Sequence, residues 1–278
     1  LRSVQLDGYK FLINGKSVFQ RLILDQGFYP DGVLTAPSDA DLKHDIQMSM
    51  EMGFNGARAH EKIFEERWLY HADKAGYLVW GEYPNWGLDH TYDDAIYAVL
   101  PEWLEEIDRD RNHPCIIGWC PFNETWDMYG RKQHDDILSL VYRATKAADK
   151  TRPCIDTSGN FHVETDVFDL HDYEQNVGIF KENNDKIIET GIPWDRFEDR
   201  QTYKKGQPVF ISEYGGIKWS ATDGNSRDVS WGYGDVPETE EEFKARYKGL
   251  TDLINTLDDT AQANGGRVML SVSANEVI

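Results

Sequence analysis

Two short apolar runs, each leading to a glutamate, most constrain the fold of this chain. The first covers residues 115–120 and leads to Glu124, and the second covers residues 208–212 and leads to Glu213. Runs this short and apolar are typical of parallel strands buried on both faces. In an α/β barrel the C-terminal ends of such strands meet at one mouth, which carries the chemistry. The pattern therefore predicts a pair of carboxylates at one site.

The same unit of helix, glycine, apolar strand and polar tip recurs along the chain. Strands are expected at residues 20–25, 53–60, 77–84, 115–120, 153–158, 167–173 and 208–213, with a weaker eighth at 268–272. Helices are expected at residues 38–52, 64–75, 93–111, 132–150 and 239–257, with a poorly defined helix before the seventh strand. A chain of 278 residues suits a single barrel, whose usual size is about 250 residues. We therefore predict an α/β fold, a (β/α)8 TIM barrel with an atypical or incomplete eighth strand.

A β-hairpin is predicted before the barrel. Asn14 and Gly15 lie between two apolar runs within residues 6–19, and Asn-Gly is the preferred pair for a two-residue hairpin turn. This hairpin would cap the bottom of the barrel or join it to a preceding domain. The expected organisation is one domain over residues 1–278, with residues 1–19 as hairpin or linker and residues 20–278 as barrel.

Composition excludes several classes of partner. The formal net charge of −20 argues against nucleic acid and anionic membranes, because both require a basic surface. No apolar run approaches the roughly 18 residues of a membrane-spanning helix. The three cysteines have no zinc-site spacing, which favours reduced cysteines with a structural role. We expect no cofactor; a homo-oligomer remains open.

The neighbours of the two glutamates suggest different roles for them. Glu124 lies between Phe122 and Trp126, an apolar setting that would keep a general acid protonated. Glu213 precedes Tyr214 and two glycines, which leave room for donors to an ionised nucleophile. Two such carboxyls lie about 5–5.5 Å apart in retaining glycosidases and about 6.5–9.5 Å apart in inverting ones. The sequence does not fix this separation.

Several ordered motifs resemble the catalytic barrel of glycoside hydrolase family 2, the family of β-galactosidases, β-glucuronidases and β-mannosidases. They are Asn123-Glu124, ISEYGG at residues 211–216, and the phrases LINGKSV, GFNGARAH and VWGEYP. The resemblance covers residues 6–257. It implies a retaining β-glycoside hydrolase with Glu124 as general acid/base and Glu213 as nucleophile. It also implies a carbohydrate substrate, and jelly-roll and immunoglobulin-like domains preceding residue 1.

The resemblance extends to neighbouring side chains. It implies that Asn123 bonds the sugar 2-hydroxyl and that Tyr173 bonds the nucleophile. Arg58 and His60 correspond to an Arg and a His after the second strand, although their spacing is one residue shorter than the family's Arg-x-Ser-His. Arg58 would orient the nucleophile, whereas His60 could equally be a packed or solvated histidine.

Further candidates follow from their positions at strand ends. Glu82 would contact sugar or, as we favour, support the barrel mouth. His171 and Asp172, beside Tyr173, are expected to contact the sugar or the catalytic groups. Trp126, Trp219 and Trp231 are candidate sugar platforms, with core packing as the alternative.

Two departures from the family's motifs limit the metal and the substrates to be expected. Family members with a magnesium site carry Glu-x-His-Gly after the third strand, but residues 83–87 read YPNWG, so we predict no metal. No Asn-x-Lys motif of the glucuronidases is present, which favours a neutral β-glycoside such as a galactoside. The alternatives are a non-catalytic carbohydrate-binding barrel or another hydrolase of the same clan, such as a mannanase or cellulase. Residues 123–125 form a glycosylation sequon inside the proposed site, which favours the cytoplasm over a periplasmic or extracellular location.

Overall fold

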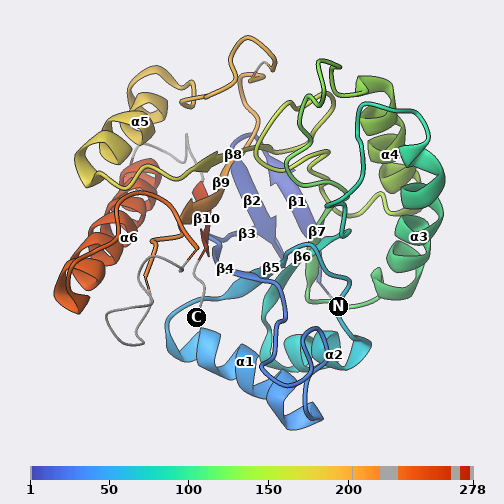
Figure 1. Cartoon of the computed structure of the whole chain (residues 1–278), viewed down its shortest axis with the longest axis horizontal. Helices are drawn as coiled ribbons and strands as arrows, with labels where there is room; N and C mark the ends of the chain where they lie inside the picture. The colour runs from blue at the N-terminus through green and yellow to red at the C-terminus, as the bar shows by residue number, and fades with distance from the viewer. Residues whose placement is uncertain (1, 202, 220–230, 264–269, 276–278) are drawn as a thin grey trace.

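A ring of helices surrounds a parallel sheet in the computed structural model, which describes residues 2–201, 203–219, 231–263 and 270–275, with side chains to residue 257 (Figure 1). The sheet strands are β4 (Arg21–Asp25), β5 (Gly56–Ala59), β6 (Leu78–Glu82), β7 (Ile116–Cys120), β8 (Phe168–Asp172), β9 (Val209–Gly215) and β10 (Leu270–Asn275). The helices are α1 (Asp39–Glu51), α2 (Glu66–Ala75), α3 (Ala95–Asp110), α4 (Asp135–Ala148), α5 (Val177–Thr190) and α6 (Glu240–Ala263). The sheet order is β7-β6-β5-β4-β10-β9-β8, with every pair parallel. The predicted α/β barrel is confirmed.

The fifth predicted strand is not a regular strand. Residues 153–158 form only isolated parallel bridges with the β7 side of the barrel, Trp119 to Cys154 and Asn123 to Ser158. Proline at position 153 has no N–H to donate, and the Asp156 side chain accepts a bond from the next backbone N–H at 2.9 Å. Both features interrupt the backbone hydrogen bonds that a regular strand would make with its neighbours. The segment nevertheless lies beside β7, and the Ser158 side chain at its end bonds to Asp169 of β8.

The eighth strand is displaced along the sequence. It was predicted at residues 268–272, whereas β10 covers Leu270–Asn275; residues 268 and 269 lie outside the described part of the chain. β10 pairs with β9 on one side and with β4 on the other, so it links the first and seventh barrel strands. Its pairing with β9 contains a register shift.

The N-terminal residues form a three-stranded antiparallel sheet of β1 (Val4–Asp7), β2 (Lys10–Ile13) and β3 (Lys16–Ser17). The predicted Asn14-Gly15 turn joins β2 to β3, and both residues have positive φ, 52° and 75°. The sequence analysis missed β1. Phe11 is buried in one apolar cluster with Trp80, so the small sheet packs against the barrel core.

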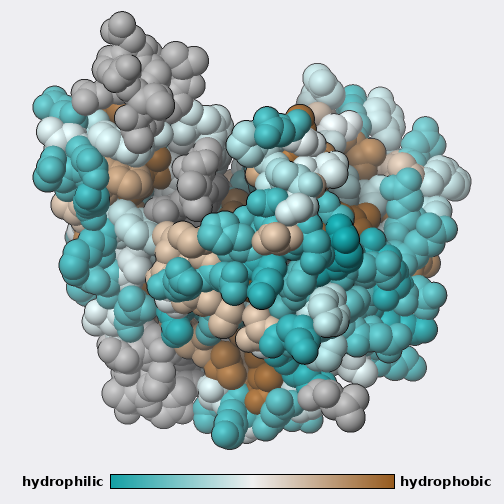
Figure 2. Space-filling model, turned by 90° about the horizontal axis from the view of Figure 1, so that it is seen from below, coloured by the Kyte–Doolittle hydropathy of each residue, from teal (hydrophilic) through white to brown (hydrophobic). Residues whose placement is uncertain are grey.

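The surface is polar, as the charge suggested. Figure 2 shows hydrophilic residues over most of the described face, with only small apolar areas. Among the described residues, no helix is both long and apolar enough to cross a membrane. All three cysteines are buried and free of disulfides, in agreement with the predicted structural role.

Candidate active site

Glu124 and Glu213 meet at the C-terminal ends of the barrel strands. One carboxylate oxygen of each residue and a ring nitrogen of His171 lie within 4.8 Å of one another. The Glu213 side chain is 4% exposed and the Glu124 side chain is 24% exposed. The barrel therefore brings together two glutamates that are far apart in the sequence.

A β-bulge in β9 orients Glu213. Leu170 pairs with Ile211, but the next residue, His171, pairs with Glu213, so Ser212 is an extra residue in the ladder. Such a bulge redirects the side chains around it. Ser212 and Glu213 consequently both bond to side chains of other barrel segments. β9 also continues to Gly215, so Glu213 lies inside the strand and not at the predicted end.

Three side chains surround the Glu213 carboxylate. Arg58 Nη1 donates to Oε1 at 3.1 Å, and the Tyr173 hydroxyl donates to Oε2. His171 Nε2 lies 3.3 Å from Oε1. Hydrogen bonds from charged and hydroxyl donors are short and strong, so these contacts hold the Glu213 side chain in one orientation.

Glu82 holds one of these side chains, Arg58, in place and also bonds to His60. Its Oε1 accepts from Arg58 Nε at 2.5 Å, and its Oε2 lies 3.0 Å from His60 Nδ1. Burial acts to raise the pKa of Glu82, but the charges and hydrogen bonds of Arg58 and His60 lower it to about 2. With both oxygens bonded to protein, Glu82 and His60 form a buried support for Arg58.

Asn85, which the sequence analysis did not identify, fixes the backbone of Asn123. Its Oδ1 accepts from Asn123 N at 2.7 Å, and its Nδ2 donates to Asn123 O at 2.9 Å. Arg58 Nη2 donates to Asn123 Oδ1 at 3.3 Å. Among the described residues, the buried Asn123 Nδ2 has no partner and remains available as a donor.

The surroundings of Glu124 differ from the expected apolar setting. His171 Nδ1 lies 2.9 Å from Glu124 Oε1. Burial acts to raise the pKa of Glu124, but the hydrogen bond and charge of His171 outweigh it and lower the pKa. The expectation that apolar neighbours keep this carboxyl protonated is therefore wrong. Glu124 also has a left-handed backbone, with φ of 48°, a strained conformation often found at functional sites.

Polar residues behind His171 form a network that the sequence analysis did not identify. Ser158 Oγ lies 3.0 Å from His171 Nε2 and donates to Asp169 Oδ2 at 2.6 Å. The Ser212 hydroxyl also donates to Asp169, and His162 Nε2 lies 3.0 Å from Asp169 Oδ1. The sequence signals for this network are that Ser158, Asp169 and Ser212 all lie in or at the end of predicted strands.

The predicted tryptophan platforms have different environments. Trp126 is 42% exposed and makes edge contacts with Phe161 and Phe197 at centroid distances of 6.0 and 5.8 Å. Trp219 stacks on Phe243 of α6 at 5.3 Å, which supports its packing alternative.

Trp231 joins the site through a second aromatic residue. It is 59% exposed and contacts Tyr233 edge to face, and Tyr233 stacks on Tyr173 at 3.6 Å. Tyr233 therefore connects Trp231 with Tyr173 of the site. Asp172, in contrast, accepts from Asn184 of α5 at 3.3 Å and supports that helix.

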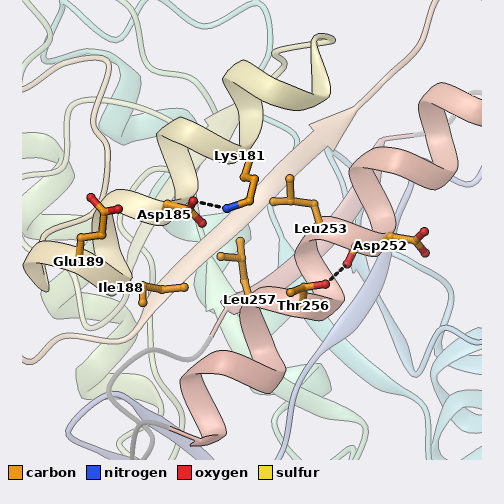
Figure 3. A pocket seen from close by; sticks show the side chains of 8 residues that line it. All are labelled: Lys181, Asp185, Ile188, Glu189, Asp252, Leu253, Thr256 and Leu257. Atoms are coloured by element: carbon orange, nitrogen blue, oxygen red, sulfur yellow. Dashed lines mark hydrogen bonds and ion pairs between the residues drawn. The ribbon is translucent and has the colours of Figure 1, made fainter.

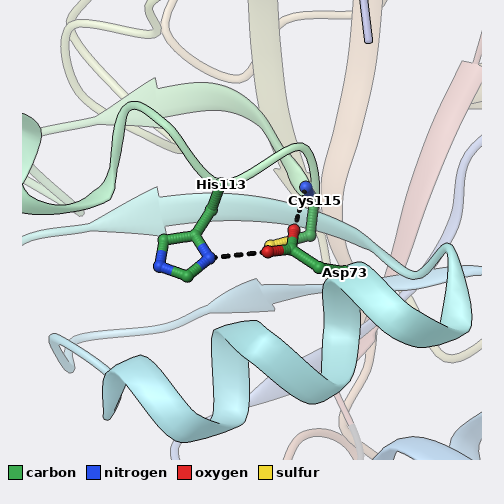
Figure 4. A group of neighbouring side chains, drawn as sticks. All are labelled: Asp73, His113 and Cys115. Atoms are coloured by element: carbon green, nitrogen blue, oxygen red, sulfur yellow. Dashed lines mark hydrogen bonds and ion pairs between the residues drawn. The ribbon is translucent and has the colours of Figure 1, made fainter. Parts of the chain in front are cut away.

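A second group, Asp73, His113 and Cys115, resembles a ligand set but acts as a clamp (Figure 4). Asp73 accepts from Cys115 N at 2.7 Å, and its other oxygen lies 2.7 Å from His113 Nδ1. Burial raises the pKa of the Cys115 thiol, so no thiolate ligand forms readily. The group ties α2 to the start of β7.

A groove of about 450 Å³ lies between α5 and α6 (Figure 3). Its lining combines Leu253 and Leu257 with an ion pair between Lys181 and Asp185. It lies between two outer helices and includes neither glutamate of the pair. The pair at the strand ends is therefore the stronger candidate for chemistry.

Known proteins match the chain along most of its length. The family model described as "Glycosyl hydrolases family 2, TIM barrel domain" matches residues 4–269. A β-galactosidase of Thermoanaerobacter pseudethanolicus is 30% identical over 185 residues, 64% of this chain and 23% of that protein. A β-glucuronidase of Felis catus is 26% identical over 235 residues, 77% of this chain and 33% of that protein. The solved structure of a β-glucuronidase from an uncultured Clostridium sp. aligns with a TM-score of 0.72 at 20% identity, covering 99% of this chain and 46% of that one. The chain thus spans less than half the length of each of these proteins.

Proposed function

The chain belongs to glycosyl hydrolase family 2, and from this premise we propose that it is a retaining hydrolase of neutral β-glycosides, with a β-galactoside as the preferred substrate. The observation that carries the proposal is the approach of Glu124 and Glu213, whose nearest oxygens lie within 4.8 Å. This supports the short carboxyl separation of retaining enzymes, about 5–5.5 Å, over the longer one that leaves room for a water.

Glu213 is the nucleophile in this proposal. Its oxygen forms a bond to the anomeric carbon as the glycosidic C–O bond breaks, giving a covalent glycosyl-enzyme. Arg58 holds one Glu213 oxygen and Tyr173 holds the other, which fixes the orientation of the attacking carboxylate. Because both donors are held within the protein, little reorganisation is needed during the reaction.

Glu124 is the general acid/base. It gives a proton to the departing oxygen, and it then takes a proton from the water that releases the sugar from Glu213. Its partial exposure, in contrast with buried Glu213, leaves room for the leaving group and water.

Asn123 supplies a donor to the sugar. Its Nδ2 is buried without a protein partner, and its orientation is fixed by Arg58 and Asn85. A hydrogen bond from Nδ2 to the sugar 2-hydroxyl would strengthen in the transition state. Trp126 and Trp231 are proposed as outer platforms for the substrate, since both are exposed.

The charges around the pair favour a neutral sugar. Arg58 and His171 are both bonded to carboxylates of the site, so neither is free to pair with a uronate carboxylate. The acidic chain would also repel an anionic substrate. The relatives include enzymes named β-galactosidase and β-glucuronidase, so substrate choice requires a direct test.

The test compares the parent with Glu124→Gln and Glu213→Gln on 4-nitrophenyl β-galactoside, β-glucoside, β-mannoside and β-glucuronide. We expect turnover to be fastest on the galactoside and to fall by at least about 10³-fold in Glu213→Gln. A 2-deoxy-2-fluoro galactoside should label Glu213 covalently. Binding without turnover by the parent would indicate a carbohydrate-binding barrel, and faster cleavage of the glucuronide would reject the neutral substrate.

A further inference from the structure

His171 lies between the two glutamates, with one ring nitrogen close to each. Its Nδ1 is 2.9 Å from Glu124 Oε1, and its Nε2 is 3.3 Å from Glu213 Oε1. The His171 side chain is only 6% exposed, so its ring contacts these carboxylates and very little water. One imidazole therefore connects the acid with the nucleophile of the proposed reaction.

Hydrogen bonding behind the ring fixes its tautomer. Asp169 is an acceptor for Ser158, and it also accepts from Gly159 N at 3.0 Å. Because the Ser158 hydroxyl donates to Asp169, its oxygen must accept the hydrogen bond from His171 Nε2. The proton on Nε2 is thus retained, and only Nδ1, which faces Glu124, can exchange a proton.

We propose that Glu124 and His171 Nδ1 share a single exchangeable proton, and that the attack of Glu213 on the anomeric carbon releases this proton to the departing oxygen. This inference rests on the proposed glycosidase function for its kinetic consequence. His171 is a positioning residue in this scheme, since it acts through Glu124 and does not contact the bond that breaks.

The charge on Glu213 couples its attack on the anomeric carbon to the release of the proton. In the resting site the proton lies on Nδ1, because an imidazolium between two carboxylates is favoured. As the bond from Glu213 to the anomeric carbon forms and the glycosidic C–O bond breaks, the negative charge of Glu213 disappears and the imidazolium loses one of its two anions. In the same step the proton moves from Nδ1 to the Glu124 carboxyl group and from there to the departing oxygen. Water later returns one proton to the Glu124–His171 pair as Glu213 leaves the sugar.

The charged groups around the ring favour its protonated form in the resting site. Burial acts to lower the pKa of His171, but Glu213, Glu124 and Asp169 together raise it. The titratable and charged groups that face the ring are Glu124 after β7, Asp169 and Tyr173 on β8, and Glu213 on β9, with Arg58 on β5 behind Glu213.

The first test observes the proton directly and needs no turnover. Nitrogen NMR of the 15N-labelled protein follows the His171 ring, assigned by its loss in His171→Asn. We expect Nε2 to stay protonated while Nδ1 alone titrates, at a lower pH in Glu124→Gln and in Glu213→Gln than in the parent. An Nδ1 titration unmoved by Glu213→Gln, or an unprotonated Nε2, would overturn the inference.

The second test separates proton donation from folding. On a phenyl β-galactoside, which needs a proton at its leaving group, His171→Asn should lose about 10²-fold in kcat/KM at pH 7. On the same phenyl substrate, the basic limb of the pH profile should move to lower pH. On the 2,4-dinitrophenyl glycoside, whose leaving group needs no proton, kcat/KM should change only a few-fold. His113→Asn, in the remote clamp with Asp73, is the matched control and should keep the parent profile. Equal losses on both substrates would contradict proton sharing, whereas a parent inactive on every glycoside would reject the proposed function and leave the NMR result to decide this inference.

Discussion

Arg58 Nη1 lies 3.1 Å from Glu213 Oε1, with both side chains buried, and the Nε of the same guanidinium lies 2.5 Å from Glu82 Oε1. One cation thus balances two carboxylates inside the barrel. Removing one partner of a buried charge pair leaves the other uncompensated, which costs more than the pair itself contributes. Arg58 is therefore expected to matter for stability and for the orientation of Glu213.

Arg58→Met should lower the free energy of unfolding by about 3–5 kcal/mol at pH 7, because Glu82 and Glu213 lose their common cation. Chemical denaturation measures this loss. The matched control is Arg143→Met, since Arg143 Nε pairs with Glu164 Oε2 at 2.9 Å but is 71% exposed. That variant should cost less than about 1 kcal/mol. Equal losses in the two variants would show that burial does not decide the contribution of Arg58.

Glu82 should make the barrel sensitive to acid. Its folded-state pKa of about 2 lies below the ordinary value of an unfolded glutamate, so its stabilisation is present above that value and is lost as pH falls toward 2. Unfolding experiments on the parent and on Glu82→Gln should therefore differ most near pH 7 and converge between roughly pH 5 and pH 2. Glu164→Gln serves as the control from a surface ion pair, because the Glu164 side chain is 35% exposed, and it should show only a small difference at every pH. A Glu82→Gln difference that stays constant with pH would contradict the expectation.

Glu106 should have the opposite effect on the pH dependence of the free energy of unfolding. It is buried on α3, one of its oxygens has no partner among the described residues, and burial raises its pKa well above the usual range. The folded protein then keeps a proton that the unfolded chain releases, so the free energy of unfolding falls as pH rises above the ordinary glutamate pKa. Glu106→Gln should raise that free energy by about 1–2 kcal/mol at pH 7. Thermal unfolding at pH 5 and pH 8 checks this, with exposed Glu105→Gln as the control; a loss of stability in Glu106→Gln at pH 8 would refute it.

Local signals predicted most of the fold. Gly76 ends α2 in the left-handed conformation that favours glycine, and the Asn14-Gly15 turn joins β2 to β3 as expected. Similar signals mark both ends of α5, where Asn176 accepts from the first-turn N–H groups and Gly191 ends the helix. Local signals could not predict that residues 153–158 form no regular strand. Their side chains compete for backbone hydrogen bonds with strands that are distant in sequence.

The site was less predictable because its electrostatics depend on tertiary contacts. Phe122 and Trp126 suggested an apolar setting for Glu124, yet the decisive neighbour is His171, 47 positions along the chain. The bulge at Ser212 likewise arises only when β9 pairs with β8. Motifs could indicate which side chains reach the barrel mouth, but the protonation of each depends on which charges lie beside it there. The catalytic roles of Glu124 and Glu213 stay predictions until variants are measured.

Gly159 gives a separate way to disturb His171 without changing any polar group. A Cβ at this position would lie 2.7 Å from His171 Nε2 and closer to other ring atoms, so the ring would have to move. Gly159 also has a φ of +89°, and backbone strain alone should cost Gly159→Ala about 1–2 kcal/mol.

Gly53 supplies the matched control, because its φ is +97° and a Cβ there would have no neighbour within 4 Å. Gly53→Ala should therefore lose similar stability in thermal unfolding but retain the parent pH profile. Gly159→Ala should in addition lower kcat/KM on phenyl β-galactoside by roughly 10-fold or more at pH 7, since Nδ1 no longer meets Glu124. Parallel kinetic behaviour of the two variants would mean that the position of the imidazole does not affect proton delivery. A divergence confined to substrates with poor leaving groups would assign the effect to the Glu124–His171 contact.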